Sequence, residues 1–260
     1  MTSKKLIGIL EKLSPRIFAE DWDNLGLLCG RHNKEVKKVL VAVDATDEVI
    51  DQAVKEKVDM IITHHPLIFK GLKRVTDDDF IGRRILKICK SDICLYAMHT
   101  NFDVIGMSDE AADIMDLSNR SVLMTTFEDN ICKEGIGRVG MLPKQLTLQE
   151  CAERVKELFH IDAVRVYGEL DKPVDIVAIS PGSGKNMTSY ALKAGAEVLI
   201  TGDIDHHEGI DAVARGLSII DASHFGIEKI FIDYVVDYIV NEIGDIKAIA
   251  ANQKQPYSVV

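Results

Sequence analysis

Short apolar, β-branched runs alternate with amphipathic stretches along nearly the whole chain. Of all features of the sequence, this alternation places the strongest limit on the fold. Strands are predicted at 38–45, 58–63, 93–98, 137–142, 163–168, 174–180, 196–201, 217–222 and 246–251. Helices are predicted at about 4–13, 79–90, 108–116, 147–160, 186–194, 208–215 and 224–241, and another follows Thr46 or Asp47. Strands that are apolar on both faces are typical of a sheet with helices on either side. The sequence therefore predicts an α/β protein.

The two halves of the chain resemble each other. Residues 38–65 and 174–203 both read as strand, polar turn, helix and strand, ending in a threonine followed by polar residues. This pattern predicts two related α/β lobes, although any two such units look alike, and both interpretations stay open. Residues 117–136 have weak periodicity and are predicted to connect the lobes. The first lobe is then residues 1–125 plus 221–260, and the second is residues 126–220.

Charge, hydropathy and cysteine content indicate which binding partners and which cellular compartment to expect. The chain has 31 basic and 41 acidic residues, a net charge of −10, which disfavours a nucleic-acid or anionic-membrane surface. Its longest hydrophobic tract is interrupted by Asp233 and Asp237, so no membrane span is predicted. The 5 cysteines form no C-x-x-C pair, which favours reduced thiols in a cytoplasmic protein.

Histidines at strand ends are the main functional signal, because sites in α/β sheets form at the carboxyl ends of strands. The candidates are His64 and His65 after 58–63, His99 with Asp103 after 93–98, and His224 with Glu228 after 217–222. Imidazole and carboxylate suit Zn, Fe, Mn or Ni. One catalytic ion takes about three protein ligands, so this number of candidates favours a bridged pair of ions. Each histidine taken alone is more simply a surface or hinge residue.

Five short segments together resemble one known family. They are Trp22-Asp23-Asn24-Leu25-Gly26-Leu27, Ile62-Thr63-His64-His65-Pro66, His99-Thr100-Asn101-Phe102-Asp103, Thr201-Gly202-Asp203 and His224-Phe225-Gly226-Ile227-Glu228. In this collinear set the chain resembles the GTP cyclohydrolase 1 type 2 homologues, also called NIF-three-like dinuclear-metal proteins. The resemblance implies two lobes of three-layer α/β/α structure with a metal cleft between the lobes, and a toroidal homohexamer.

The resemblance also implies two divalent ions per subunit, of undetermined identity. Carried over position by position, the metal ligands are His64, His65, Asp103, His224 and Glu228. Glu228 is the expected bridge. His99 is outside that set, and we expect it to support a ligand through a hydrogen bond or to act as a general acid or base. Gly226 departs from the family pattern and is expected to loosen the helix that aims Glu228.

Three other segments have competing interpretations. Trp22, Asp23 and Asn24 either line the mouth of the cleft or form a structural turn. Residues 203–208, which include His206 and His207, are a rival metal cluster by composition, but we interpret them as a loop near the main site. Residues 180–186 lack the spacing of a phosphate-binding P-loop and are interpreted as a tight turn.

The predicted function is that of a metal-dependent hydrolase in which two ions activate water for attack on a nucleotide or another cyclic C–N bond. The family name points to GTP, although the motifs specify metals and no substrate. Lys70, Lys73 and Lys185 are the candidates for contacts to a small-molecule substrate carrying phosphate. The alternative is a non-enzymatic metal-binding scaffold or regulatory protein. Nucleic-acid binding is disfavoured by the charge.

Overall fold

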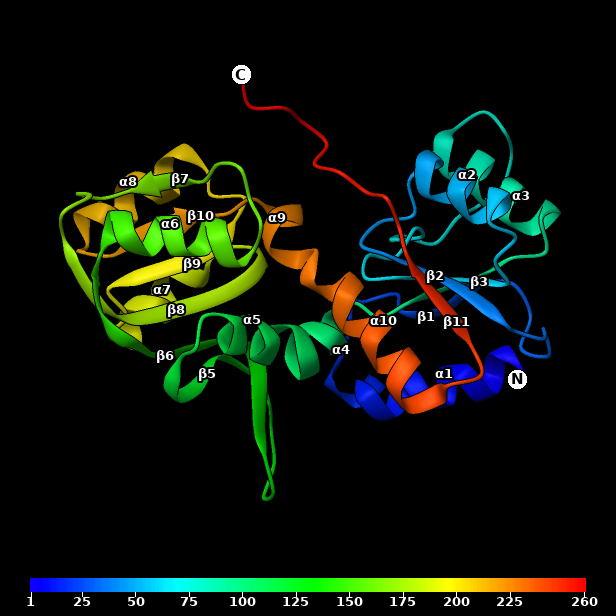
Figure 1. Ribbon diagram of the computed structural model, residues 1–260, viewed down its shortest axis with the longest axis horizontal. Helices are drawn as coiled ribbons and strands as arrows, with labels where there is room; N and C mark the ends of the chain where they lie inside the picture. The colour runs from blue at the N-terminus through cyan, green and yellow to red at the C-terminus, as the bar shows by residue number, and fades with distance from the viewer. The chain divides into compact units, whose positions relative to one another are not determined.

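The computed structural model describes residues 1–260, which form two compact units. Unit 1 is Met1–Phe102 with Phe231–Lys254, and unit 2 is Asp103–Ile230 with Gln255–Val260. Each unit has its own sheet and its own helices (Figure 1). The predicted α/β class with two lobes is therefore confirmed. No helix of the chain combines the length and the apolar character that crossing a membrane requires.

Unit 1 is built from two separate segments of the chain, residues 1–102 and 231–254. Its elements are α1 (Ser3–Leu13), η1 (Arg16–Phe18), β1 (Gly26–Cys29), β2 (Lys38–Ala42), α2 (Asp47–Lys55), β3 (Met60–Thr63), α3 (Phe80–Lys90), β4 (Cys94–Ala97), α4 (Thr100–Phe102), most of α10 (Ile230–Ile243) and β11 (Lys247–Ala250). Thr46 caps α2 by accepting a hydrogen bond from the Val49 amide, which settles the choice between Thr46 and Asp47.

The sheet of unit 1 has the order β1-β4-β3-β2-β11 and is parallel except for the edge strand β1. One face packs against α2 and α3 through a cluster that includes Leu40, Ile61 and Leu95. The alternate residues Val41 and Ile62 are also fully buried, and Figure 1 shows α1 and α10 on their side of the sheet. The unit therefore has three layers, as the apolar runs predict.

Unit 2 is nearly continuous in sequence. Its elements are η2 (Asp103–Met107), α5 (Ser108–Ile114), β5 (Ser118–Glu128), β6 (Lys133–Thr147), α6 (Leu148–Leu158), β7 (Arg165–Tyr167), β8 (Pro173–Ser183), α7 (Met187–Lys193), β9 (Val198–Gly202), α8 (His206–Ala214), β10 (Ser218–Asp221) and α9 (His224–Glu228). Thr147 and Glu150 form a capping box at the start of α6, where the sequence predicts the helix to begin.

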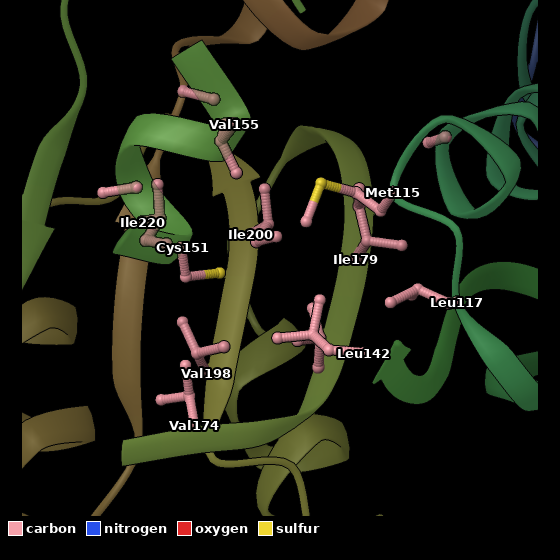
Figure 2. Close-up of a cluster of buried hydrophobic side chains, with 14 of the residues drawn as sticks. Met115, Leu117, Leu142, Cys151, Val155, Val174, Ile179, Val198, Ile200 and Ile220 are labelled. Atoms are coloured by element: carbon pink, nitrogen blue, oxygen red, sulfur yellow. The ribbon is translucent and has the colours of Figure 1, made fainter. Parts of the chain in front are cut away.

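The sheet of unit 2 has the order β5-β6-β8-β9-β10-β7, with a parallel centre of β8, β9 and β10. Figure 2 shows Cys151 and Val155 of α6 directed toward Val198, Ile200 and Ile220 of β9 and β10. The neighbouring strand residues point the other way and join α7 and α8 in a second cluster. Because both faces are buried, the central strands carry apolar residues on both faces.

The connecting segment predicted at 117–136 is wrong. These residues belong to β5 and β6, which pair antiparallel and extend as a two-stranded ribbon beyond the rest of the sheet (Figure 1). Most of β5 is exposed or half-buried and only Leu123 is buried, so the ribbon has no hydrophobic period to detect. The boundaries between the units lie at Phe102/Asp103 and Ile230/Phe231, whereas the sequence places them near residues 125 and 221.

Three smaller predictions also differ from the structure. The predicted helix 224–241 is two helices, α9 and α10, which are separated at Lys229. The apolar period runs through this junction, so it hides the break. Residues 26–29, where no strand is predicted, form β1. The helix predicted at 108–116 is shorter, Ser108–Ile114, and the Ser108 hydroxyl donates to the Asp103 carbonyl.

Candidate metal centre

Three histidines come together at one edge of the sheet in unit 1. His64 and His65 follow β3, and His99 follows β4, the parallel neighbour that pairs Ala97 with Thr63. One ring nitrogen of each histidine lies within 4.8 Å of one from each of the others. The ring centroids are 4.7 Å apart for His64 and His65, and 5.3 and 5.5 Å from each of these to His99. Parallel strand ends therefore assemble a cluster of imidazoles, as predicted.

The Nδ1 atom of every histidine in this cluster faces a hydrogen-bond acceptor. His64 Nδ1 lies 2.9 Å from the Met98 carbonyl, His65 Nδ1 lies 2.9 Å from Asp44 Oδ1, and His99 Nδ1 lies 2.8 Å from Asp23 Oδ1. A carbonyl or carboxylate oxygen only accepts, so each neutral ring carries its proton on Nδ1. The lone pair is then on Nε2, which is the arrangement of a metal-ligating histidine with its outer partner.

Asp23 is built into this arrangement. Its side chain is fully buried, and besides contacting His99 it accepts hydrogen bonds from the Thr100 amide and hydroxyl. Burial raises the pKa of Asp23, but the hydrogen bonds from His99 and Thr100 outweigh burial and hold the pKa below its usual value. Beyond the two interpretations of residues 22–24, Asp23 has a role of its own, since its carboxylate orients His99.

Unit 2 contributes a histidine and two carboxylates. His224 and Glu228 lie one turn apart on α9, with 3.1 Å between His224 Nε2 and Glu228 Oε2. An oxygen of the Asp103 carboxylate, at the start of η2, lies within 4.8 Å of a Glu228 oxygen. His224 Nδ1 lies 2.7 Å from Asp203 Oδ2, so this histidine has the same outer partner type as those of unit 1.

The position of Glu228 depends on two glycines. Ser223, at a φ of 62°, caps α9 by accepting from the Gly226 amide, and a Cβ on Gly226 would lie 2.5 Å from the Ser223 hydroxyl oxygen. Gly226 therefore permits the cap that starts this helix. Gly182 has a φ of +82°, and a Cβ there would lie 2.4 Å from Glu228 Oε1. The backbone of β8 thus lies directly against the carboxylate.

The electrostatics of His224 follow from these contacts. Burial lowers the pKa of its imidazole, but hydrogen bonds to Glu228 and Asp203 outweigh burial and raise the pKa to about 9. At neutral pH without metal, His224 is a cation that donates to both carboxylates. A metal ion that binds Nε2 takes the place of that proton.

The rival cluster at 203–208 does not assemble as a metal site. His206 and His207 begin α8, their rings lie 5.3 Å apart, and no group of metal-ligand type in the chain includes either of them. Asp205 caps the helix by accepting from the Glu208 amide. Only Asp203 of this segment serves the site, through His224. The turn at 180–186 continues β8 as far as Ser183, and Glu208 accepts from the Asn186 amide.

Sequence reasoning missed the outer partners of the histidines. Asp44, two residues after β2, and Asp203, directly after β9, each hold a histidine Nδ1. Their position gave a signal, because both follow strands whose parallel neighbours end in the candidate ligands. His99 lies with the other two histidines, although the family resemblance leaves it outside the ligand set.

Known proteins are similar to this chain in sequence and in fold. The chain is 37% identical over 227 residues to the GTP cyclohydrolase 1 type 2 homolog of Clostridium acetobutylicum, covering 86% of this chain and 84% of that protein. A Bacillus cereus protein related to NIF3 has a TM-score of 0.94 at 26% identity, covering 100% of this chain and 99% of that one. Staphylococcus aureus protein SA1388 has a TM-score of 0.92 at 31% identity, covering 100% and 99%.

A family model matches nearly the whole chain, from residue 1 to residue 256. The relative at 37% identity aligns with this chain over most of the length of both proteins, and the solved structures match the whole fold of the chain. The chain therefore belongs to the Duf34/NIF3 (NGG1p interacting factor 3) family.

Proposed function

We propose that this protein is a metal-dependent hydrolase that holds two divalent ions. The proposed ligands are His64 and His65 of unit 1 and Asp103, His224 and Glu228 of unit 2. One observation carries the proposal: in all four candidate histidines, counting His99, Nδ1 lies within 2.9 Å of a carbonyl or carboxylate oxygen, which is the outer contact of a histidine that ligates a metal through Nε2.

The donor sets of the two units complement each other. The cluster of unit 1 is made of imidazoles, which are uncharged when they ligate, whereas unit 2 supplies two carboxylates that balance cationic charge. Glu228 is 2% exposed, and burying a carboxylate is costly unless cationic partners surround it. We assign Glu228 the bridging position, because its two oxygens allow it to contact two ions.

The chemistry follows from this arrangement. Two ions, when bound, supply Lewis acidity and lower the pKa of water at the site. The chain's own contribution is to orient ligands and to handle protons. His99, held by the ionised Asp23, is the proposed general acid or base. The relatives are named GTP cyclohydrolase 1 type 2 homologs, so hydrolysis of a cyclic C–N bond, as in the ring of GTP, is the reaction class to test first.

Metal content tests the site. The chain is stripped with a chelator, reloaded separately with zinc, manganese, iron(II) and nickel, and analysed for bound metal. We expect two ions per chain in the wild type and loss of at least one in His65→Ala and in Glu228→Gln. His32→Ala removes an exposed histidine of unit 1 and should keep both ions. Unchanged metal content in Glu228→Gln would contradict the proposed ligand set.

Turnover tests the reaction. The reloaded protein is assayed against GTP and other nucleotides, phosphoesters and cyclic amides, in parallel with Glu228→Ala. We expect turnover of one class that disappears in the variant. Metal-dependent turnover that survives in Glu228→Ala contradicts the mechanism. Tight binding of two ions with no turnover of any class rejects the hydrolase and supports the metal-binding scaffold.

A further inference from the structure

Two aromatic side chains lie exposed beside the histidine cluster of unit 1. Trp22 is 58% exposed and Phe69 is 50% exposed. Their ring centroids are 5.8 Å apart with an interplanar angle of 31°, and each ring lies 5.9 Å from the His99 ring. Both meet His99 edge to face, so together they form an apolar wall next to a proposed proton-transfer residue.

The local structure holds this wall in place. Trp22 directly precedes Asp23, whose buried carboxylate accepts from His99 and Thr100. Phe69 directly follows Ile68, whose carbonyl accepts a hydrogen bond from the Asn24 side chain. The two loops that carry the aromatic rings are therefore tied both to each other and to His99.

Packing within the chain does not account for this exposure. Phe80 is exposed to a similar extent, 51%, but the Arg84 guanidinium of the same helix lies 5.1 Å from its ring centroid. Trp22 and Phe69 contact each other and the imidazole of His99, and they leave half or more of their surface to solvent. Large aromatic rings beside convergent polar groups are typical of ligand sites, because covering them removes much apolar area from water.

We propose that Trp22 and Phe69 are the recognition surface for a planar aromatic heterocycle of the substrate, stacked so that its reacting part faces the histidine cluster. This inference rests on the proposed hydrolase function and adds to it the residues that bind the ring of the substrate. The occupant is a flat ring because the indole and phenyl faces, only 31° from parallel, match a flat partner, and stacking on aromatic side chains tolerates different ring substituents.

The single tryptophan of the chain makes the test direct, because all indole fluorescence comes from Trp22. The full-length, metal-stripped protein is titrated with guanosine and adenosine, and with ribose and inorganic phosphate as ring-free probes. We expect saturable quenching by the nucleosides and none by ribose or phosphate. Absence of saturable quenching by the nucleosides, or equal quenching by ring-free probes, overturns the proposal.

Variants locate the binding surface. Calorimetry on Trp22→Leu and Phe69→Leu should show nucleoside affinity reduced roughly tenfold in each, as loss of one stacking contact predicts. Phe80→Leu, the matched exposed phenylalanine, should bind as the wild type does. Wild-type affinity in both wall variants overturns the proposal. So does a change in sedimentation that appears only in the wall variants, because a second copy would then be what covers Trp22 and Phe69.

The test of the recognition surface can fail or succeed independently of the test of the metal site. Trp22→Leu and Phe69→Leu should keep the wild-type metal content, and Glu228→Gln should keep nucleoside binding. With an active substrate in hand, the wall variants should raise KM more than they lower kcat. If metal content fails while nucleosides still bind at the wall, the hydrolase proposal falls and the recognition surface stands.

Discussion

The two units place ligand-type residues at the ends of similar parallel strands, yet the donors differ in charge. Unit 1 offers a cluster of three histidines, whereas unit 2 offers two carboxylates and one histidine. In unit 1 the histidines are oriented by a carbonyl and two aspartates. In unit 2 the critical carboxylate is placed by close backbone approach at Gly182. Unit 1 thus orients neutral histidine ligands, whereas unit 2, with a similar sheet, supplies the carboxylates that balance the charge of the ions.

The largest effect is expected from Gly182→Ala, which disturbs only the placement of the Glu228 carboxylate in unit 2. The new methyl group would lie 2.4 Å from Glu228 Oε1 and must displace that carboxylate. We expect loss of at least one ion per chain, measured by elemental analysis. Gly195→Ala is the control, because Gly195 has a similar φ of +76° but an added Cβ meets nothing within 4 Å. It should lose about 1–2 kcal/mol of stability through backbone strain and keep its metal.

Next in size are Asp44→Asn in unit 1 and Asp203→Asn in unit 2. Each removes a carboxylate that holds a histidine Nδ1, at 2.9 Å from His65 and 2.7 Å from His224. Losing such a partner typically lowers metal affinity about 10–100-fold. Competition with a chelator measures the affinity, and Asp211→Asn, an exposed change on α8, should have no effect. Unchanged affinity in one of the two variants would show that the unit concerned does not ligate through its histidine.

Asp23→Asn sharpens the role of His99. The substitution weakens the bond between Asp23 and His99 Nδ1 while keeping the shape of the side chain. If His99 handles protons, turnover falls while both ions stay bound, and the pH–rate profile shifts. Parallel measurement of metal content and rate distinguishes the roles. A loss of metal comparable to that in His65→Ala would instead make His99 a ligand and would leave the unit 1 set with three ligating histidines.

The smallest effect is expected from Ile131→Ser at the tip of the β5–β6 ribbon. Ile131 is 93% exposed and lies in the turn capped by Asp129, which accepts from the Ile131 and Cys132 amides. A surface change of this kind should alter stability by less than about 0.5 kcal/mol and leave metal content unchanged. Thermal unfolding checks the first expectation. A marked loss of metal would mean that unit 2 depends on more than the elements around α9.

The central strands and the candidate ligands were predictable, because burial on both faces forces apolar runs and the polar residues after them stand out. His64 and His65 after β3 are such a case. The β5–β6 ribbon was not predictable, because strands that are solvated on both faces carry no period. The break at Lys229 was hidden because the apolar stripe continues from Ile227 to Phe231. Asp44 and Asp203 follow strands next to those of the candidate ligands, but nothing in the sequence pairs either aspartate with a particular histidine.

The order in which the chain leaves the ribosome matters for unit 1. Residues 103–230 of unit 2 form one uninterrupted stretch, whereas unit 1 needs Phe231–Lys254, which are synthesised after that stretch. Until β11 emerges, β2 is an unpaired edge in the nascent protein, since Lys38–Val41 have no partners from Lys247–Ala250. The apolar side chains Phe231, Val235 and Ile239 of α10 are also absent during that time. We therefore expect unit 2 to fold during translation before unit 1, which cannot complete its sheet until β11 has been synthesised.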